Sequence, residues 1–192
     1  SARSLMDTMR EDAARGGAVR EAVGPEVELY LDANCGLDLA HATRLARWVS
    51  DCDISFFEEP ITQNDAAHMA ELRRLTGMAV AAGQNEGLLF RFRDLIQAGA
   101  IDYVQPNAVI SGGYSQCLKI AAYAAAHNLP VVNGGAWPFH NMHLQAGVSN
   151  GTMVEYHHFA VDACSRIFPD LPQPQGGCFH LPETPGLGFE PD

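Results

Sequence analysis

The sequence predicts an α/β fold: an incomplete (β/α)8 TIM-like barrel of about six parallel strands alternating with helices, followed by an extended C-terminal tail. Three observations support this prediction. Helix-type and strand-type apolar patterns alternate along the chain with short connections. The strand segments are short and apolar throughout, as expected when helices cover both faces of a sheet. Their spacing is nearly constant and no G-x-G-x-x-G follows the first strand, which favours a barrel over an open doubly wound sheet.

Three helix–strand units are expected in the first part of the chain. Apolar residues recur at helical spacing in the first segment, and Gly24-Pro25 ends it. Asn64 is expected to cap the third helix at its N-terminus, and Gly77 to end it. The expected elements are, in order, helix 4–23, strand 27–31, helix 38–50, strand 54–57, helix 64–75 and strand 78–82.

Three further units are expected in the second part. They are helix 88–98, strand 101–105, an Ala-rich helix 114–127, strand 129–132, helix 139–148 and strand 152–156. After Phe159 the chain becomes rich in Pro and Gly, which is typical of an extended segment. We therefore expect a partial barrel domain over residues 1–160 and a tail over residues 161–192 that packs on it.

Composition narrows the classes of function. The chain is 47% hydrophobic and 18% charged, which is typical of a globular protein. Its net charge of −11 argues against nucleic-acid and anionic-membrane partners. Five cysteines without a C-x-x-C pair argue against a disulfide framework or a zinc site and favour a cytoplasmic location; Cys35 is expected to be a packing side chain. No apolar stretch approaches membrane-spanning length, and no signal-peptide pattern is present.

Polar side chains follow three successive strands at equal intervals. Asp32, Glu58 and Gln84 each come just after an apolar run, with 26 residues from one to the next. The carboxyl ends of parallel barrel strands carry the functional residues, so these side chains are expected to converge. Glu86 lies on the same side of its extended segment as Gln84. Oxygen ligands of this kind suit Mg²⁺, so the sequence predicts a magnesium site at these residues.

Two histidines follow the fifth predicted strand. His140 and His143 are spaced for one helix face, and His140 lies nearer to the strand end. We expect His140 to act as an acid or base, with capping or packing as the open alternative. His157 and His158 are expected to satisfy backbone groups, and Trp137 is expected to pack under the rim.

Three runs resemble the metal-binding strand ends of the enolase superfamily. They are Leu31-Asp32-Ala33-Asn34, Phe57-Glu58-Glu59-Pro60 and Ala82-Gly83-Gln84-Asn85-Glu86. The run 104–107 followed by Gly112-Gly113, and the tail segment 182–188, resemble the next strand and the C-terminal end of the same family. The resemblance is greatest to the mandelate racemase/muconate lactonizing enzyme-like barrel domain, in its acid-sugar dehydratase branch.

The resemblance implies a Mg²⁺-dependent enzyme that removes the proton α to the carboxylate of a small hydroxy acid and eliminates water. It implies that Asp32 and Glu58 are ligands, and that Asn34 and Glu155 lie against the substrate near its carboxylate. With His140, Glu155 is therefore our candidate catalytic residue. With Asn34, the strand-end amides Asn107 and Asn133 are candidate substrate contacts.

The chain departs from the family at three positions. The third ligand is usually Glu but is Gln84 here, so the ligand is either Gln84 or Glu86. The residues of the family's Asp–His pair are replaced by Asn107 and Gly134, neither of which is a general base near neutral pH. The family's lysine base would fall before Ser1.

These departures leave alternatives open. Dehydration is favoured over racemisation or epimerisation, because racemisation needs two opposed bases. A non-catalytic homologue that retains a metal or ligand pocket is the other alternative. The chain alone is expected to be inactive, since by resemblance it lacks two strands and a capping domain, on which the tail would otherwise pack. An open barrel edge also favours association into a homo-oligomer.

Overall fold

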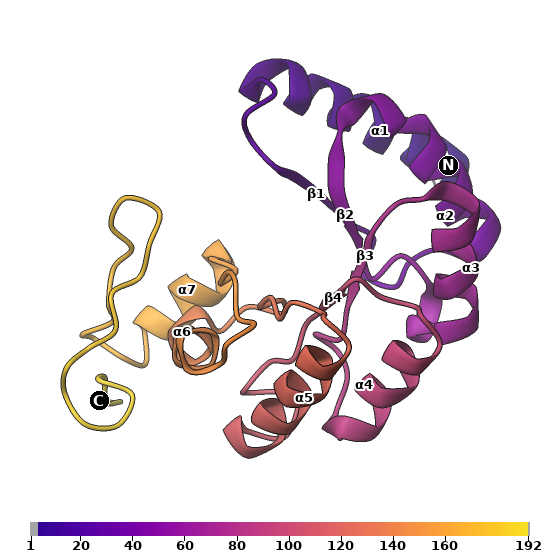
Figure 1. Ribbon diagram of the computed structural model, residues 1–192. Coiled ribbons are helices and arrows are strands. Elements are labelled where there is room, and N and C mark those ends of the chain that lie inside the picture. Colours follow the sequence, from indigo (N-terminus) through magenta and orange to yellow (C-terminus); the bar gives the residue numbers. More distant parts are fainter. Residues whose placement is uncertain (1–3, 192) are drawn as a thin grey trace. The chain divides into compact units, whose positions relative to one another are not determined.

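A computed structural model describes residues 4–191 of the chain (Figure 1). The α/β class is confirmed: the strands form a parallel sheet in the order β1-β2-β3-β4, with helices between them. The chain divides into two compact units. Unit 1 contains the described residues up to Ala81 together with Gln97–Asp102, and unit 2 contains Ala82–Ile96 and the residues from Tyr103 onwards.

Unit 1 repeats a helix followed by a strand. Its elements are α1 (Leu5–Val23), β1 (Leu29–Asp32), α2 (Leu39–Trp48), the 3-10 turn η1 (Ser50–Cys52), β2 (Ile54–Glu58), the 3-10 turn η2 (Thr62–Asn64), α3 (Ala66–Thr76) and most of β3 (Val80–Ala82). β1 pairs in parallel with β2, and β2 with β3. All of β3 is buried, as its uninterrupted apolar run predicted.

The helix ends of unit 1 follow local rules, with one correction. Ser4 and Asp38 cap α1 and α2 with their side-chain oxygens. Gly77 ends α3 in the left-handed conformation, with φ of 71°, as expected. The N-cap of α3 is Asp65 and not Asn64, since the Asp65 side chain accepts from the backbone N–H of His68. Asn64 is buried in a contact with another side chain, described below.

Unit 2 contains fewer strands than expected. Its elements are α4 (Leu88–Gln97, whose last residue falls in unit 1), β4 (Tyr103–Val104), α5 (Tyr114–Ala126), α6 (Pro138–Gly147) and α7 (His158–Ser165). The segment predicted as strand 129–132 forms parallel bridges from Val131 to Val104 and to Gly151, but not a full strand. The prediction of a strand over 152–156 is wrong, because the bridge partner Gly151 lies just before that segment. Pro130 lacks the N–H that would lengthen the ladder. The described residues thus hold four strands, and bridges continue the parallel order.

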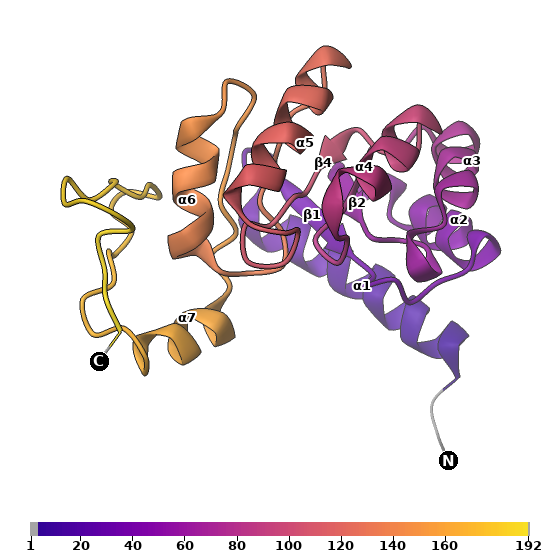
Figure 2. The ribbon, with the colours of Figure 1, turned by 90° about the horizontal axis from the view of Figure 1, so that it is seen from below.

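The C-terminal tail contains a helix that the sequence pattern did not indicate. The His157 side chain accepts from the backbone N–H of Ala160 and caps α7. From Arg166 onwards the tail is irregular, as expected, and it lies beside α6 and α7 (Figures 1 and 2). Phe139 of α6, Cys164 of α7 and the tail residues Leu171 and Phe189 form one buried apolar cluster. This cluster fixes the tail to unit 2.

Two further predictions concern covalent links and membranes. All five cysteines are free thiols in the structure, in line with the expected lack of a disulfide framework. None of the helices within residues 4–191 has the length and apolar character that crossing a bilayer requires.

Candidate functional site

Unit 1 brings together the two carboxylates expected to bind metal. Asp32 ends β1 and Glu58 ends β2, and the two residues are direct partners in the parallel register. Neighbouring strands lie roughly 5 Å apart, so the two side chains leave the sheet at one edge and at the same level. Asp32 is exposed and Glu58 is half-buried. Two hard oxygen donors at one strand edge are the beginning of a Mg²⁺ site.

Asn34 orients the Asp32 carboxylate. The backbone N–H of Asn34 donates to Asp32 Oδ1 at 2.7 Å, and its side-chain Nδ2 donates to Oδ2 at 2.8 Å. This double contact needs a left-handed backbone at Asn34, with φ of 45°. Asn residues adopt that conformation more readily than most, which explains an Asn two residues after Asp32. Asn34 is therefore a positioning residue for Asp32 in this structure, and its substrate contact remains a prediction.

The carboxylate that follows Glu58 has a structural role that the sequence did not reveal. Glu59 is fully buried, and its Oε1 accepts from Asn64 Nδ2 at 2.9 Å. The Cys35 thiol lies 3.5 Å from Glu59 Oε2, and the Cys35 backbone N–H donates to the Glu59 carbonyl. Cys35 is thus a donor that links the segments after β1 and β2. The contact fits the expected structural role better than that of a nucleophile.

In unit 2, the two candidates for the third ligand lie in different surroundings. Glu86 accepts from Arg91 Nε at 2.8 Å and Nη2 at 3.2 Å, and only 12% of its side chain is exposed. Gln84 is almost fully buried, and its amide oxygen faces Gly134 and Gly135. If Glu86 turned to bind a metal, it would lose its ion pair with Arg91. This cost favours Gln84 over Glu86 as the predicted third ligand.

Buried amides hold the loop formed by residues 133–137. Asn107 is fully buried, and its Nδ2 donates to the carbonyls of Gly134, Gly135 and Ala136 at 2.9–3.2 Å. Its Oδ1 accepts from Asn141 Nδ2 at 3.1 Å and from a backbone N–H. Both ends of the Asn107 amide are engaged with this loop and its neighbours, so a substrate contact from Asn107 stays a prediction.

Glu155 and Asn133 belong to the same network. Glu155 Oε2 accepts from the backbone N–H of Ala136 at 2.7 Å. Asn133 accepts from the Glu155 backbone N–H and donates to the carbonyls of Gly134 and Ala136. These contacts stabilise left-handed conformations at Ala136 and Trp137, with φ of 64° and 58°. The structure gives both residues a loop-holding role, while catalysis by Glu155 and substrate contact by Asn133 remain predictions.

Gly134 leaves room for two glutamine side chains. A Cβ atom at this position would lie 2.6 Å from Gln105 Nε2 and 3.1 Å from Gln84 Oε1. A larger residue therefore requires these amides or the backbone to shift. The packing of the loop therefore favours glycine at position 134.

His140 lies in an aromatic environment. Its ring is edge-on to Trp137, Phe168 and Phe189, with centroid distances of 5.3–6.2 Å. Its Nδ1 is buried and has no hydrogen-bond partner among residues 4–191. Burial, and secondarily the charge of His143, lower the pKa of His140 below its ordinary value. A neutral ring is a competent proton acceptor, but the contacts in place are those of packing.

The remaining histidines take structural roles. His143 contacts the Leu187 carbonyl at 3.0 Å and so joins α6 to the tail. His157 caps α7 by accepting from the backbone N–H of Ala160, as expected, while His158 is the first residue of that helix and its ring lies edge-on to Tyr156. Asn141 and Gln105 are components of unit 2 that the sequence did not indicate as site residues. Asn141 lies within a helix, and Gln105 ends a predicted strand but is not one of the three residues spaced 26 apart.

The side chains near the strand ends determine which metal ligands the protein can supply. Among residues 4–191, no group of three or more His, Cys, Asp or Glu side chains is arranged to hold a metal ion. Asp32 and Glu58 are the two carboxylates expected to bind a metal, and the third predicted ligand is either the Gln84 amide oxygen or the Glu86 carboxylate. A site with Gln84 in third place would have one negative charge fewer than a site with three carboxylates, and a lower Mg²⁺ affinity is expected for it.

Comparison with known proteins gives a consistent result. The family model described as "Enolase C-terminal domain-like" matches residues 3–192. An L-rhamnonate dehydratase of Saccharopolyspora erythraea is 34% identical over 178 residues, which is 88% of this chain and 45% of that protein. A 3,6-anhydro-alpha-L-galactonate cycloisomerase of Streptomyces coelicolor is 31% identical over 183 residues, 94% of this chain and 49% of that protein. The chain spans about half the length of the curated relatives it matches.

Solved structures agree with the sequence relatives. A mandelate racemase/muconate lactonizing enzyme from a marine actinobacterium, in complex with magnesium, superposes with a TM-score of 0.86 at 33% identity, covering 96% of this chain and 52% of that one. An L-talarate dehydratase from Polaromonas sp. JS666, complexed with Mg and L-glucarate, gives 0.86 at 29% identity, covering 96% and 50%.

Proposed function

The chain belongs to the enolase C-terminal domain-like family of the enolase superfamily, and from that membership we propose that the protein is a Mg²⁺-dependent acid-sugar dehydratase. In this proposal it removes the proton α to the carboxylate of a small hydroxy acid and eliminates water. Relatives named as L-rhamnonate and arabinonate dehydratases support the substrate class. Because the chain spans half of such proteins, the activity is proposed for the whole protein.

The register pairing of Asp32 with Glu58 carries the proposal. Both would bind Mg²⁺, with Gln84 as the proposed third ligand and Glu86 as the weaker alternative. Bound Mg²⁺ would neutralise the substrate carboxylate and make its α-proton more acidic. Asn34 would keep the Asp32 oxygens oriented toward the ion through its two hydrogen bonds.

The proposed roles in proton transfer and substrate contact belong to residues of unit 2. Burial lowers the pKa of His140, and we propose that His140 accepts or donates a proton at a ring nitrogen. Glu155, Asn107 and Asn133 would contact substrate only if the loop of residues 133–137 released some of their hydrogen bonds. The loop would therefore have to rearrange when substrate binds.

Calorimetric titration with Mg²⁺ tests the site without relying on turnover. We expect saturable binding that Asp32→Asn and Glu58→Gln each weaken at least tenfold. Asp94→Asn is the matched control, because Asp94 is an exposed carboxylate on α4 that pairs with Arg93. Equal Mg²⁺ affinity in all four proteins would refute the assignment of the ligands. Turnover of a panel of acid sugars then tests the reaction.

A non-catalytic homologue that retains a metal or ligand pocket is the second candidate. The observation that favours it is the buried hydrogen-bonding of Asn107 at the position where the family has an acid–base residue. Mg²⁺ binding without turnover of any acid sugar would favour this candidate. Interconversion of epimers without loss of water would instead favour a racemase or epimerase.

The remaining proposals concern the location, the oligomeric state, the partners and the domain organisation of the protein. We propose a cytoplasmic, homo-oligomeric protein that has no nucleic-acid or membrane partner, on the basis of composition and the open sheet edge. We also propose that residues 1–160 act as the catalytic domain and residues 161–192 as a tail. The buried contacts of Leu171 and Phe189 with Phe139 support packing of the tail on the barrel part of the chain.

A further inference from the structure

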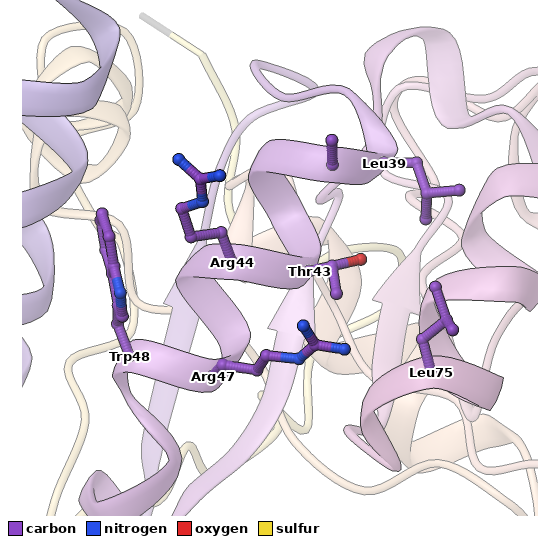
Figure 3. A pocket seen from close by; sticks show the side chains of 7 residues that line it. Leu39, Thr43, Arg44, Arg47, Trp48 and Leu75 are labelled. Carbon is purple, nitrogen blue, oxygen red and sulfur yellow. The ribbon is translucent and has the colours of Figure 1, made fainter.

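A pocket lies on α2 and α3 and contains none of the candidate site residues. Its volume is about 540 Å³, and its lining comes from α2 and from Leu75 of α3. Figure 3 shows Arg47, Thr43 and Leu39 extending from α2 on the side that faces Leu75, while Arg44 and Trp48 point away from Leu75. Four residues share this side of the pocket: Leu39, Thr43, Arg47 and Leu75.

Arg47 is unusual among the arginines of this acidic chain. Within residues 4–191, every arginine except Arg44 and Arg47 donates to a carboxylate or to carbonyl oxygens of the protein. Arg44 contacts only the Met6 sulfur, and Arg47 has no hydrogen bond or ion pair in this part of the chain. The chain has 23 acidic residues and 12 basic ones, yet the exposed Arg47 guanidinium has none of the acidic residues within 4–191 as a partner, so it is available to an anion from outside.

A second observation points to the same ligand. Thr43 is only 8% exposed, and its Oγ1 has no hydrogen-bond partner among the described residues. A buried hydroxyl normally bonds to a neighbouring carbonyl or to water, and leaving it unpaired is costly. An oxyanion bound against α2 would accept the Thr43 hydroxyl hydrogen and pair with Arg47. The unsatisfied group and the unpaired cation are one helical turn apart.

The apolar walls of the pocket indicate that the anionic ligand has an apolar part. Leu39 is half-buried and Leu75 is 39% exposed, and both present methyl groups to the same space as Arg47. Apolar walls with a few polar groups are typical of sites for small organic ligands. A fully hydrated inorganic anion would gain nothing from the two leucines.

We propose that Arg47 and Thr43 bind the carboxylate of a small organic acid whose apolar body lies between Leu39 and Leu75. This site is separate from the strand-end carboxylates and from the proposed dehydration. Its ligand is an acid with an aliphatic or aromatic body, in contrast to the polyhydroxylated acids proposed as substrates. A negative result for this organic-acid site would not affect the proposed dehydratase function.

Calorimetry with octanoate as the probe tests the proposal on the purified protein. We expect saturable binding at one site, weakened at least tenfold by Arg47→Ala and about threefold or more by Thr43→Val. Arg93→Ala is the matched control, an exposed arginine on α4 outside the pocket, and should bind octanoate as the unmodified protein does. Thr43→Val should also raise the melting temperature of the unliganded protein, since it removes the unsatisfied hydroxyl.

Three outcomes would overturn the proposal. Equal octanoate affinity in the Arg47→Ala and unmodified proteins would remove Arg47 from the site. Phosphate binding as tight as octanoate, with the same loss in Arg47→Ala, would indicate a simple anion site without an apolar part. No octanoate binding at millimolar concentration, together with an Arg47-dependent change of oligomeric state in sedimentation, would identify the face as a contact between copies of the chain.

Discussion

At the scale of single residues, the polar side chains predicted as site residues in unit 2 form hydrogen bonds with other parts of unit 2. Asn107 uses both ends of its amide within the protein, and Glu155 accepts from the Ala136 backbone N–H. Asn107 donates to the carbonyls of Gly134, Gly135 and Ala136, whereas an ionised carboxylate at this position could only accept. The resemblance implies an acidic residue here, and Asn in its place would change the direction of the hydrogen bonds as well as the charge.

The substitution Asn107→Asp tests whether the loop carbonyls require a hydrogen-bond donor at position 107. The new carboxylate would face the carbonyls of residues 134–136, so burial and these dipoles would raise its pKa. Because a raised carboxyl pKa disfavours folding above the unfolded-state value, the loss of stability should grow as pH rises. We expect a loss on the order of 2–4 kcal/mol at pH 8 and a smaller loss at pH 5 in urea unfolding.

Asn128→Asp is the control for that substitution. Asn128 is exposed after α5 in a left-handed conformation that Asp also tolerates. Its change should alter stability by less than about 0.5 kcal/mol at either pH. A pH-independent effect at Asn107 would contradict the account of the loop carbonyls.

His140 predicts a second pH dependence. Burial lowers its pKa in the folded protein below the ordinary value of 6.5, so below that pH the unfolded state binds more protons than the folded state. The contribution of the neutral ring is fully present above pH 6.5 and is lost as pH falls through that value toward the folded-state pKa. His140→Phe should therefore reduce the fall in unfolding free energy on acidification, whereas the exposed control His68→Gln should not. An unchanged acid profile in His140→Phe would contradict this.

At the scale of elements, the loop of residues 133–137 is held by side chains from several other segments of unit 2. Gly134 admits Gln105 and Gln84, and the left-handed run Gly135-Ala136-Trp137 leads into α6. The loop has its conformation because buried amides from other elements satisfy its carbonyls. Restoring a histidine at Gly134 alone would therefore meet a steric barrier before it could contribute to chemistry.

Gly134→Ala measures that barrier. The added methyl would lie 2.6 Å from Gln105 Nε2, so we expect a loss of about 1–3 kcal/mol in thermal or urea unfolding. Gln105→Ala in the same chain should recover part of the loss, as a double-mutant cycle would show. Gly17→Ala is the control: no atom lies within 4 Å of its added Cβ, and a helix-interior Ala should leave stability equal or higher. Additive effects at Gly134 and Gln105 would contradict the contact.

At the scale of the whole molecule, the chain contains part of a larger architecture. It covers 45–50% of the curated relatives and half of the matched L-talarate dehydratase chain. Among the described residues the parallel order ends in isolated bridges at Val131 and Gly151, and not in a closed sheet. The proposed reaction therefore belongs to the complete protein.

The 192-residue chain alone should show no dehydratase turnover. Closing a site against water and completing its ligands require elements that the family resemblance places outside these residues. Product assays with L-rhamnonate and arabinonate on the chain and on the complete protein check this, with far-UV circular dichroism to establish that the chain is folded. Measurable turnover by the folded chain would refute the prediction.

The sequence by itself determined the alternation of helices and strands and the positions of Asp32 and Glu58, because apolar periodicity and strand-end placement are local properties. Its strand predictions failed at residues 129–132, where only a bridge at Val131 forms, and at 152–156, where no strand forms. It also missed α7, whose cap is a histidine. Only the tertiary structure decided what Glu59, Asn107, Glu155 and His140 contact. Their partners come from segments distant in sequence, and whether a polar side chain is open to a ligand or consumed in a buried network depends on those partners.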